Sequence, residues 1–270
     1  MSAVEALHRG DLDGALAALK DEIRSAPEDA KHRVFLFQLL AIMGDWDRSL
    51  TQLNVAGDLD PETMLMAKTY QELLNCEVLR QEVFAGRRSP MLLGEPTSWM
   101  AKAIEAQKMS AQGDYEAAKA MRDDAWDDAP PTAGKATVQS GDNPAETIEF
   151  QWIADCDTRL GPVLEAIVNG RYYWVPFEQI SRIEIDPPTD LRDFVWTPAR
   201  FTWTNEGQAP GMIPTRYAGS EADSDAEVRL ARKTSWRETG HEGFEGVGQR
   251  LLATDAAEIP LLNLRLLELS

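Results

Sequence analysis

The stretch Gly10-Asp11-Leu12-Asp13-Gly14-Ala15 determines the fold of the first half of the chain. Two similar stretches follow it, Gly44-Asp45-Trp46-Asp47-Arg48-Ser49 and Gly113-Asp114-Tyr115-Glu116-Ala117-Ala118. The copies begin at positions 10, 44 and 113, so the second gap is about twice the first. A proline follows each opening glycine at one constant interval, and these prolines are Pro27, Pro61 and Pro130. Self-similarity at a fixed period indicates a repeat architecture.

The residue types of the repeat predict pairs of helices joined by tight turns. A glycine can take the left-handed conformation that ends one helix, and the aspartate after it can cap the next. The proline then ends the second helix of the pair. Small residues five positions after the glycine let the two helices approach closely; they are Ala15, Ser49 and Ala118.

The spacing from Gly10 to Gly44, a period of about 34 residues, resembles that of the tetratricopeptide repeat (TPR). We therefore expect residues 1–130, the helical half, to form a TPR-like helical domain of about six helices. The copy expected near residue 78 is missing, and a long helix over residues 62–84 is predicted in its place.

Residues 135–270, the β half, follow a linker rich in proline and predict a mostly β, compact C-terminal domain, which makes the whole fold α+β. Asn169-Gly170 predicts a hairpin with a primed turn. The closely spaced glycines of 243–248 predict a surface loop or bulge, and residues 177–180 a short helix. The predicted strands are 148–153, 163–168, 172–175, 182–185, 200–204, 212–217, 227–236 and the closing segment 259–269.

The charge balance excludes some classes of partner. Forty-five acidic residues against 27 Lys and Arg give a formal net charge of -18, which disfavours nucleic-acid binding. No apolar run is long enough for a membrane span, and the start of the chain lacks the pattern of a signal peptide. The two cysteines suggest neither a disulfide framework nor a zinc site, so we expect a cytoplasmic protein.

Recognisable catalytic chemistry is scarce. His241 is the best placed of three histidines, but no nucleophile turn lies beside it. One alternative is a metal-dependent enzyme in which Asp155, Asp157 and Asp190 hold a divalent ion, with Arg159 or Arg192 as an anion clamp. The other interpretation is a turn in which the aspartates accept backbone N–H groups while Arg159 neutralises them.

Two longer stretches of the β half are distinctive: Trp152-Ile153-Ala154-Asp155-Cys156-Asp157-Thr158-Arg159-Leu160-Gly161-Pro162-Val163-Leu164-Glu165 and Gly170-Arg171-Tyr172-Tyr173-Trp174-Val175-Pro176-Phe177. Supported by residues 190–193, 213–217 and 246–250, they resemble the ImpE/TagJ family of type VI secretion accessory proteins. The order of the pieces extends the resemblance over nearly the whole chain. Cys156 departs from the small residue expected there, which argues against a role that needs a thiol.

The resemblance implies a non-enzymatic, cytoplasmic adaptor without a cofactor, a metal or a membrane anchor. It implies binding of an N-terminal amphipathic helix of the small subunit of the contractile sheath. For some members it implies a link to the AAA+ ATPase that recycles the sheath. A repeat scaffold with another protein client is a further alternative.

Aromatic and arginine side chains of the β half are the candidate partner contacts, because binding hot spots favour Trp, Tyr and Arg. These candidates are Trp174, Arg216, Tyr217 and Trp236. The same four residues would equally serve as the core of the domain, and the sequence leaves both interpretations open.

Overall fold

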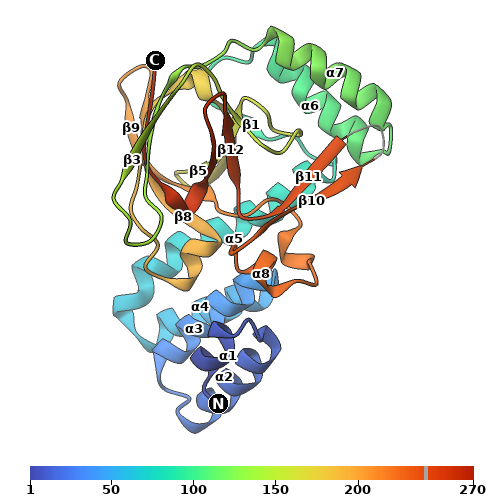
Figure 1. Ribbon diagram of the computed structural model, residues 1–270. Coiled ribbons are helices and arrows are strands. Elements are labelled where there is room, and N and C mark those ends of the chain that lie inside the picture. The colour runs from blue at the N-terminus through green and yellow to red at the C-terminus, as the bar shows by residue number, and fades with distance from the viewer. Residues whose placement is uncertain (240–242) are drawn as a thin grey trace.

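The computed structural model describes residues 1–239 and 243–270, with helices in the first half of the chain and strands in the second (Figure 1). Residues 1–130, all described, contain seven α-helices, one more than predicted. The helices are α1 (Ala3–His8), α2 (Leu12–Ser25), α3 (Ala30–Ile42), α4 (Trp46–Leu59), α5 (Met64–Phe84), α6 (Ser98–Ala111) and α7 (Tyr115–Asp128). Helix α5 is the predicted long helix.

The repeated Gly-Asp pairs behave as their chemistry requires. The three glycines have positive φ angles of 76°, 75° and 84° at Gly10, Gly44 and Gly113. The aspartate after each one caps the next helix, accepting from the amides of Gly14, Arg48 and Ala117. These turns join α1 to α2, α3 to α4 and α6 to α7, and each pair packs together. The TPR-like classification of the array stays a prediction.

The small residues of the repeat lie where two helices meet. Ala15, Ser49 and Ala118 are fully buried. The Ser49 hydroxyl donates to the Phe37 carbonyl oxygen at 2.9 Å, so a polar side chain is satisfied inside the α3–α4 contact.

A sheet of nine strands forms most of the β half, in the order β1-β6-β5-β9-β8-β7-β14-β2-β3. Its edge strand β1 comes from the helical half and pairs in parallel with β6. The strands are β1 (Met91–Leu92), β2 (Gly134–Val138), β3 (Glu146–Phe150), β5 (Val163–Val168), β6 (Arg171–Pro176), β7 (Ile180–Ile185), β8 (Trp196–Trp203), β9 (Gln208–Pro214) and β14 (Leu264–Leu269).

Two smaller sheets complete the β half. One has the order β13-β12-β4, from β4 (Ile153–Asp155), β12 (Leu251–Thr254) and β13 (Glu258–Pro260). The other is the hairpin of β10 (Thr234–Thr239) and β11 (Gly243–Gly248), which extends toward α6 and α7 (Figure 1).

The large sheet is buried on both faces where it meets the helices. On β5, Val163 and Ile167 belong to an apolar cluster shared with α3, α4 and α5. Leu164 and Ala166 belong to a second cluster, which is shared with the three-stranded sheet β13-β12-β4. Burial on both faces explains why this strand is apolar at every position except Glu165. The division into domains 1–130 and 135–270 stays a prediction.

Several strand predictions are confirmed, including the hairpin: Asn169 and Gly170 both have positive φ, as a primed turn requires. The predicted strand 227–236 is wrong, because the Asp225 side chain caps a short helix, α8 (Ala226–Arg229), and β10 begins only at Thr234. The closing strand is interrupted by a 3-10 turn, η5 (Leu261–Asn263).

The glycine-rich segment 243–248 is a strand, β11, and the prediction of a loop is wrong. A side chain at Gly246 would lie 2.4 Å from the Tyr217 ring, so the glycine lets the strand cross that ring. His241 lies outside the described residues. Within the described parts of the chain, no helix combines the length and the apolar character needed to cross a bilayer.

Candidate functional site

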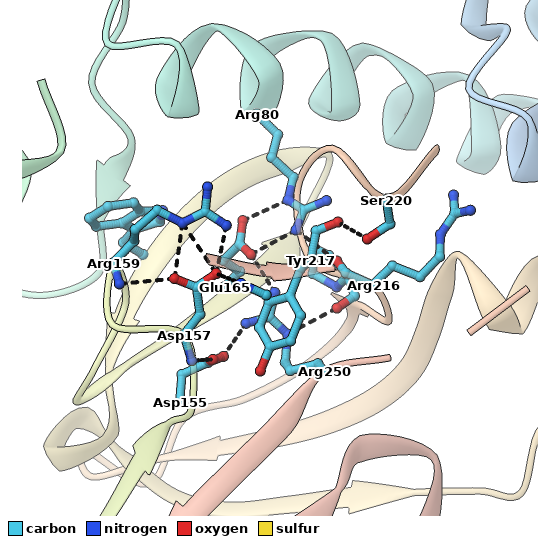
Figure 2. Close-up of polar contacts among 12 residues, drawn as sticks. Arg80, Asp155, Asp157, Arg159, Glu165, Arg216, Tyr217, Ser220 and Arg250 are labelled. Atoms are coloured by element: carbon cyan, nitrogen blue, oxygen red, sulfur yellow. Dashed lines mark hydrogen bonds and ion pairs between the residues drawn. The ribbon is translucent and has the colours of Figure 1, made fainter. Parts of the chain in front are cut away.

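A cluster of buried charges joins the two halves of the chain, centred on Glu165 of β5 (Figure 2). Arg80 of α5 holds this carboxylate with two hydrogen bonds, Nε to Oε1 at 2.7 Å and Nη2 to Oε2 at 2.8 Å. Arg250 pairs with the same carboxylate and with Asp155. The Tyr172 hydroxyl donates to Glu165 Oε1. Every carboxylate oxygen of Glu165 is therefore bound inside the protein.

The electrostatics of Glu165 follow from its two arginines. Burial alone would raise the pKa of this carboxyl, but Arg80 and Arg250 outweigh that effect and lower the pKa to about 2. A carboxylate whose two oxygens are both paired inside the protein offers nothing to an external ligand, and removing one of its partners would be costly.

Asp155 and Asp157 do not form an open metal site. Asp157 binds the Arg159 guanidinium at 2.6 Å and accepts the backbone N–H of Arg159 and of Gly246. Asp155 accepts the Asp157 amide and pairs with Arg250. The prediction of an arginine-neutralised turn is thus confirmed.

Asp190 lies apart from those two acids. It caps the 3-10 turn η3 (Leu191–Phe194) and pairs with Arg192 at 3.1 Å. Among the residues that the structure describes, no three His, Cys, Asp or Glu side chains converge as a metal site would require.

Three of the four candidate partner contacts are buried. Trp174 donates its indole N–H to the Tyr172 hydroxyl at 2.8 Å. Arg216 donates to the carbonyl oxygen of Ile42, and Tyr217 exchanges hydrogen bonds with the backbone of Leu251. Only Trp236, 40% exposed and 5.7 Å from the Tyr217 ring, presents surface to a partner. A partner-binding role for these residues stays a prediction.

An open depression with largely apolar walls lies along α3. We call it the α3 groove, a depression of about 590 Å³. Its apolar walls are Val4, Leu7, Ala30, Val34, Phe35 and Leu191, and its polar residues include Lys31, Gln38, Asp60, Thr63 and Asp190. Val4 is 50% exposed, although it is a large apolar residue. Exposed apolar surface with a polar rim is typical of a binding site for another protein.

A second depression, the α5 cleft, has a volume of about 340 Å³ and lies between α5 and strands β5, β7, β8 and β9. Leu73, Ile167 and Met212 contribute apolar surface. The Glu72 side chain, on α5, lies against Gly170 in the turn between β5 and β6. Arg200 spans two acids of this cleft, bonding Glu184 at 3.0 Å and Asp186 at 3.1 Å.

Sequence reasoning missed both depressions and the buried charge cluster. A signal for the cluster exists, because Glu165 is the only charge in the apolar run Val163–Val168. Such a charge predicts a buried ion pair, but its partners Arg80 and Arg250 lie 85 residues away in opposite directions. For the α3 groove the signal is the apolar series from Val34 to Ile42, which only Gln38 interrupts.

Three comparisons find known proteins similar to this chain, one over its C-terminal part and two over nearly all of it. The family model described as ImpE protein matches residues 147–268. The chain is 47% identical, over 268 residues, to the type VI secretion system accessory component TagJ of Pseudomonas aeruginosa, covering 99% of this chain and 91% of that protein. It is also similar to the crystal structure of protein VPA1032 from Vibrio parahaemolyticus, with a TM-score of 0.87 at 26% identity, covering 99% and 97% of the two chains.

Proposed function

This chain belongs to the ImpE family and has an accessory role in type VI secretion, and from that premise we propose that it is a non-enzymatic adaptor. Its partner in this proposal is an N-terminal amphipathic helix of the contractile sheath small subunit. The adaptor works in the cytoplasm, where this subunit is made.

The observation that carries the proposal is the largely apolar depression along α3. Residues Val34 and Phe35 are only partly buried, and with Val4 they line an open groove whose walls are helices. Helix-walled apolar grooves accept the apolar stripe of an amphipathic helix at positions i, i+3 or i+4, and i+7. The surface thus fits the class of partner that the family resemblance implies.

The charge of the chain supports a basic partner segment. A net charge of -18 attracts Lys and Arg side chains at the rim of the helix and accelerates association. It also opposes nucleic acid as a partner.

A link to the AAA+ ATPase needs a second surface, and we include this link in the proposal. The α5 cleft and the exposed Trp236 both lie outside the α3 groove. A second partner that binds to either surface leaves the first partner in the α3 groove, as an adaptor requires.

Calorimetry with a synthetic peptide tests the function. The peptide spans the first 25 or so residues of the sheath small subunit from the same genome, and a scrambled peptide of equal composition is the control. We expect a dissociation constant of about 10 µM or tighter, which is about 7 kcal/mol of binding free energy. If the native peptide gives no heat of binding at several hundred µM, the binding free energy is weaker than about 5 kcal/mol, and the proposal is contradicted.

A further inference from the structure

Five arginine side chains are buried in the described part of the chain, and one of them lacks both a carboxylate and a carbonyl partner there. The five are Arg80, Arg122, Arg159, Arg216 and Arg250. Three of them pair with carboxylates, and Arg216 donates to backbone carbonyl oxygens. Arg122, on α7, is only 7% exposed and has neither kind of partner among the described residues.

The Arg122 guanidinium makes one hydrogen bond to a described residue, from Nη2 to the Ser110 hydroxyl oxygen at 2.8 Å. Its Nε is buried and has no partner in the described part of the chain. A guanidinium carries five N–H donors, so most of its bonding capacity is unused. A buried charge without a counter-charge is costly, and this position therefore calls for a negative group.

The pKa of Arg122 reflects the missing partner. Burial lowers the pKa of this guanidinium. Burial acts in the same direction on Arg80 and Arg159, but their carboxylate partners outweigh it and raise the pKa of both. The difference lies in the neighbours and not in the depth of burial, because all three side chains are at most 7% exposed.

Arg122 lines a small cavity, the Arg122 pocket, where the last pair of helices meets the β half. Its walls come from α6, α7, the segment between β4 and β5, and the hairpin of β10 and β11, which extends toward these helices (Figure 1). Hydroxyl-bearing side chains dominate its described lining; they are Ser110, Tyr115, Thr158 and Thr239. Each hydroxyl has a proton to donate, so the walls suit a group that accepts hydrogen bonds.

The other charges at the pocket are already matched. Lys119 and Arg159 also line it, and Glu245 is the one acid among its described lining residues. Arg159 is shared by Asp157, at 2.6 Å, and Glu245, at 3.2 Å, while Lys119 binds an acid of its own helix at 2.6 Å. These acids act on Arg122 only over a longer range, so Arg122 is the charge that is left to neutralise.

The volume of the pocket, about 10 Å³, decides the class of ligand. A cavity of about 10–15 Å³ holds roughly one particle the size of a water molecule. A nucleotide, a sugar phosphate or a carboxylic acid is therefore too large. A water molecule fits but leaves the positive charge uncompensated, whereas a halide ion is little larger, is negative and accepts several N–H and O–H groups at once.

From these observations we propose that the Arg122 pocket binds one halide ion, which is chloride under ordinary conditions. Arg122 Nε and the lining hydroxyls donate to the ion, and the ion links α7 to the β half. Because the ion binds only the folded chain, it stabilises the fold. The site is independent of the adaptor function, since neither the α3 groove nor the α5 cleft shares a described lining residue with it.

Thermal unfolding in two sodium salts of equal ionic strength tests the site. Chloride fits the pocket and gluconate is too bulky, while both salts screen surface charges equally. At about 200 mM salt, the gain in melting temperature from gluconate to chloride should be about 3 °C larger in the wild type than in Arg122→Met. Arg122→Gln is a second uncharged variant if Arg122→Met fails to fold. The control Arg24→Met removes an exposed arginine and should keep the full gain.

Chlorine-35 NMR measures the ion directly, because exchange with a bound site broadens the chloride resonance. The wild type and Arg24→Met should broaden it, and Arg122→Met should lose that excess broadening. If the wild type lacks either the gain in melting temperature or the broadening, a water molecule serves Arg122 and the proposal is overturned. If both effects persist in Arg122→Met and Arg122→Gln, an adventitious ion only is bound elsewhere, which overturns the proposal as well.

Discussion

Arg216, in the β half, donates a hydrogen bond of 2.9 Å to the carbonyl oxygen of Ile42, the last residue of α3 and 174 residues earlier in the chain. The carbonyl groups at the end of a helix lack intrahelical partners and carry partial negative charge. Burial lowers the pKa of Arg216 to about 10, so the side chain remains a cation at neutral pH. The β half thereby completes the end of a helix in the helical half.

Arg216→Met should destabilise the whole chain. The substitution keeps apolar bulk but leaves the α3 carbonyl and the Arg229 carbonyl without their shared donor. We expect a loss of about 2–3 kcal/mol in the free energy of unfolding, measured with urea. Arg24→Met, at an exposed i,i+3 pair, is the control and should change the stability by under about 0.5 kcal/mol. Equal stability of the two variants would contradict this role.

The pairing of Glu165 predicts acid sensitivity. Its pKa is about 2 in the folded chain against 4.5 for the free carboxyl, which corresponds to about 3 kcal/mol. Because the folded pKa is the lower one, this stabilisation is complete above about pH 4.5 and is lost as the pH falls toward 2. Urea unfolding between pH 7 and pH 3 should show stability falling with pH.

Glu165→Gln provides the matching comparison. At neutral pH this variant leaves Arg80 and Arg250 without their shared counter-charge and should be less stable by about 3–5 kcal/mol. The difference from wild type should narrow as the pH falls below 4.5. A difference that stays constant over that range would show that Glu165 is not ionised in the folded protein.

A side chain added at Gly170 should reduce the stability of the fold more than one added at Gly113. Both have positive φ, of 69° and 84°, so either change to Ala should cost about 1 kcal/mol. At Gly170 the new Cβ also meets Glu72 Oε2 at 2.4 Å, whereas Gly113 faces open space. Gly170→Ala should therefore be the more damaging substitution in thermal melting.

A second substitution isolates the contact at Gly170. In a Glu72→Ala background, Gly170→Ala should cost only slightly more than Gly113→Ala, because the 2.4 Å contact with the carboxylate is removed and the Cβ atom of residue 72, at 3.3 Å, is all that remains beside the backbone strain. If the larger cost persists without the Glu72 side chain, close approach to that residue is not its cause.

Acids border the α3 groove: Asp60 and Asp190 line it, and the exposed Glu28 and Glu62 lie within two residues of its lining. This acidic rim predicts that salt weakens the binding of a basic partner helix. Raising the NaCl concentration screens the attraction between rim acids and a basic helix and should lower the association rate more than it raises the dissociation rate. Stopped-flow anisotropy should show a smaller salt effect for the Glu28→Gln, Glu62→Gln double variant. An unchanged salt dependence would mean that other acids steer the encounter.

Local chemistry explains which elements could be predicted. The Gly-Asp turns made the first residues of α2, α4 and α7 predictable. A left-handed glycine and a capping aspartate act on residues only a few positions away. The Asn169-Gly170 hairpin was predictable for the same reason. The strand β11 was not, because its Gly246 is required by the close approach of Tyr217, a residue distant in sequence.

The amino-acid sequence by itself determined the order of helices before strands, the repeated helix pairs, the main hairpin and the membership of the family. These features depend on periodicity and turn chemistry, which operate between near neighbours. Only the tertiary structure decided that Trp174, Arg216 and Tyr217 are buried, that Glu165 is shared by Arg80 and Arg250, and that residues of α1, α3 and η3 line one depression. Burial and charge pairing depend on which distant segments meet, and a linear pattern carries no record of that meeting.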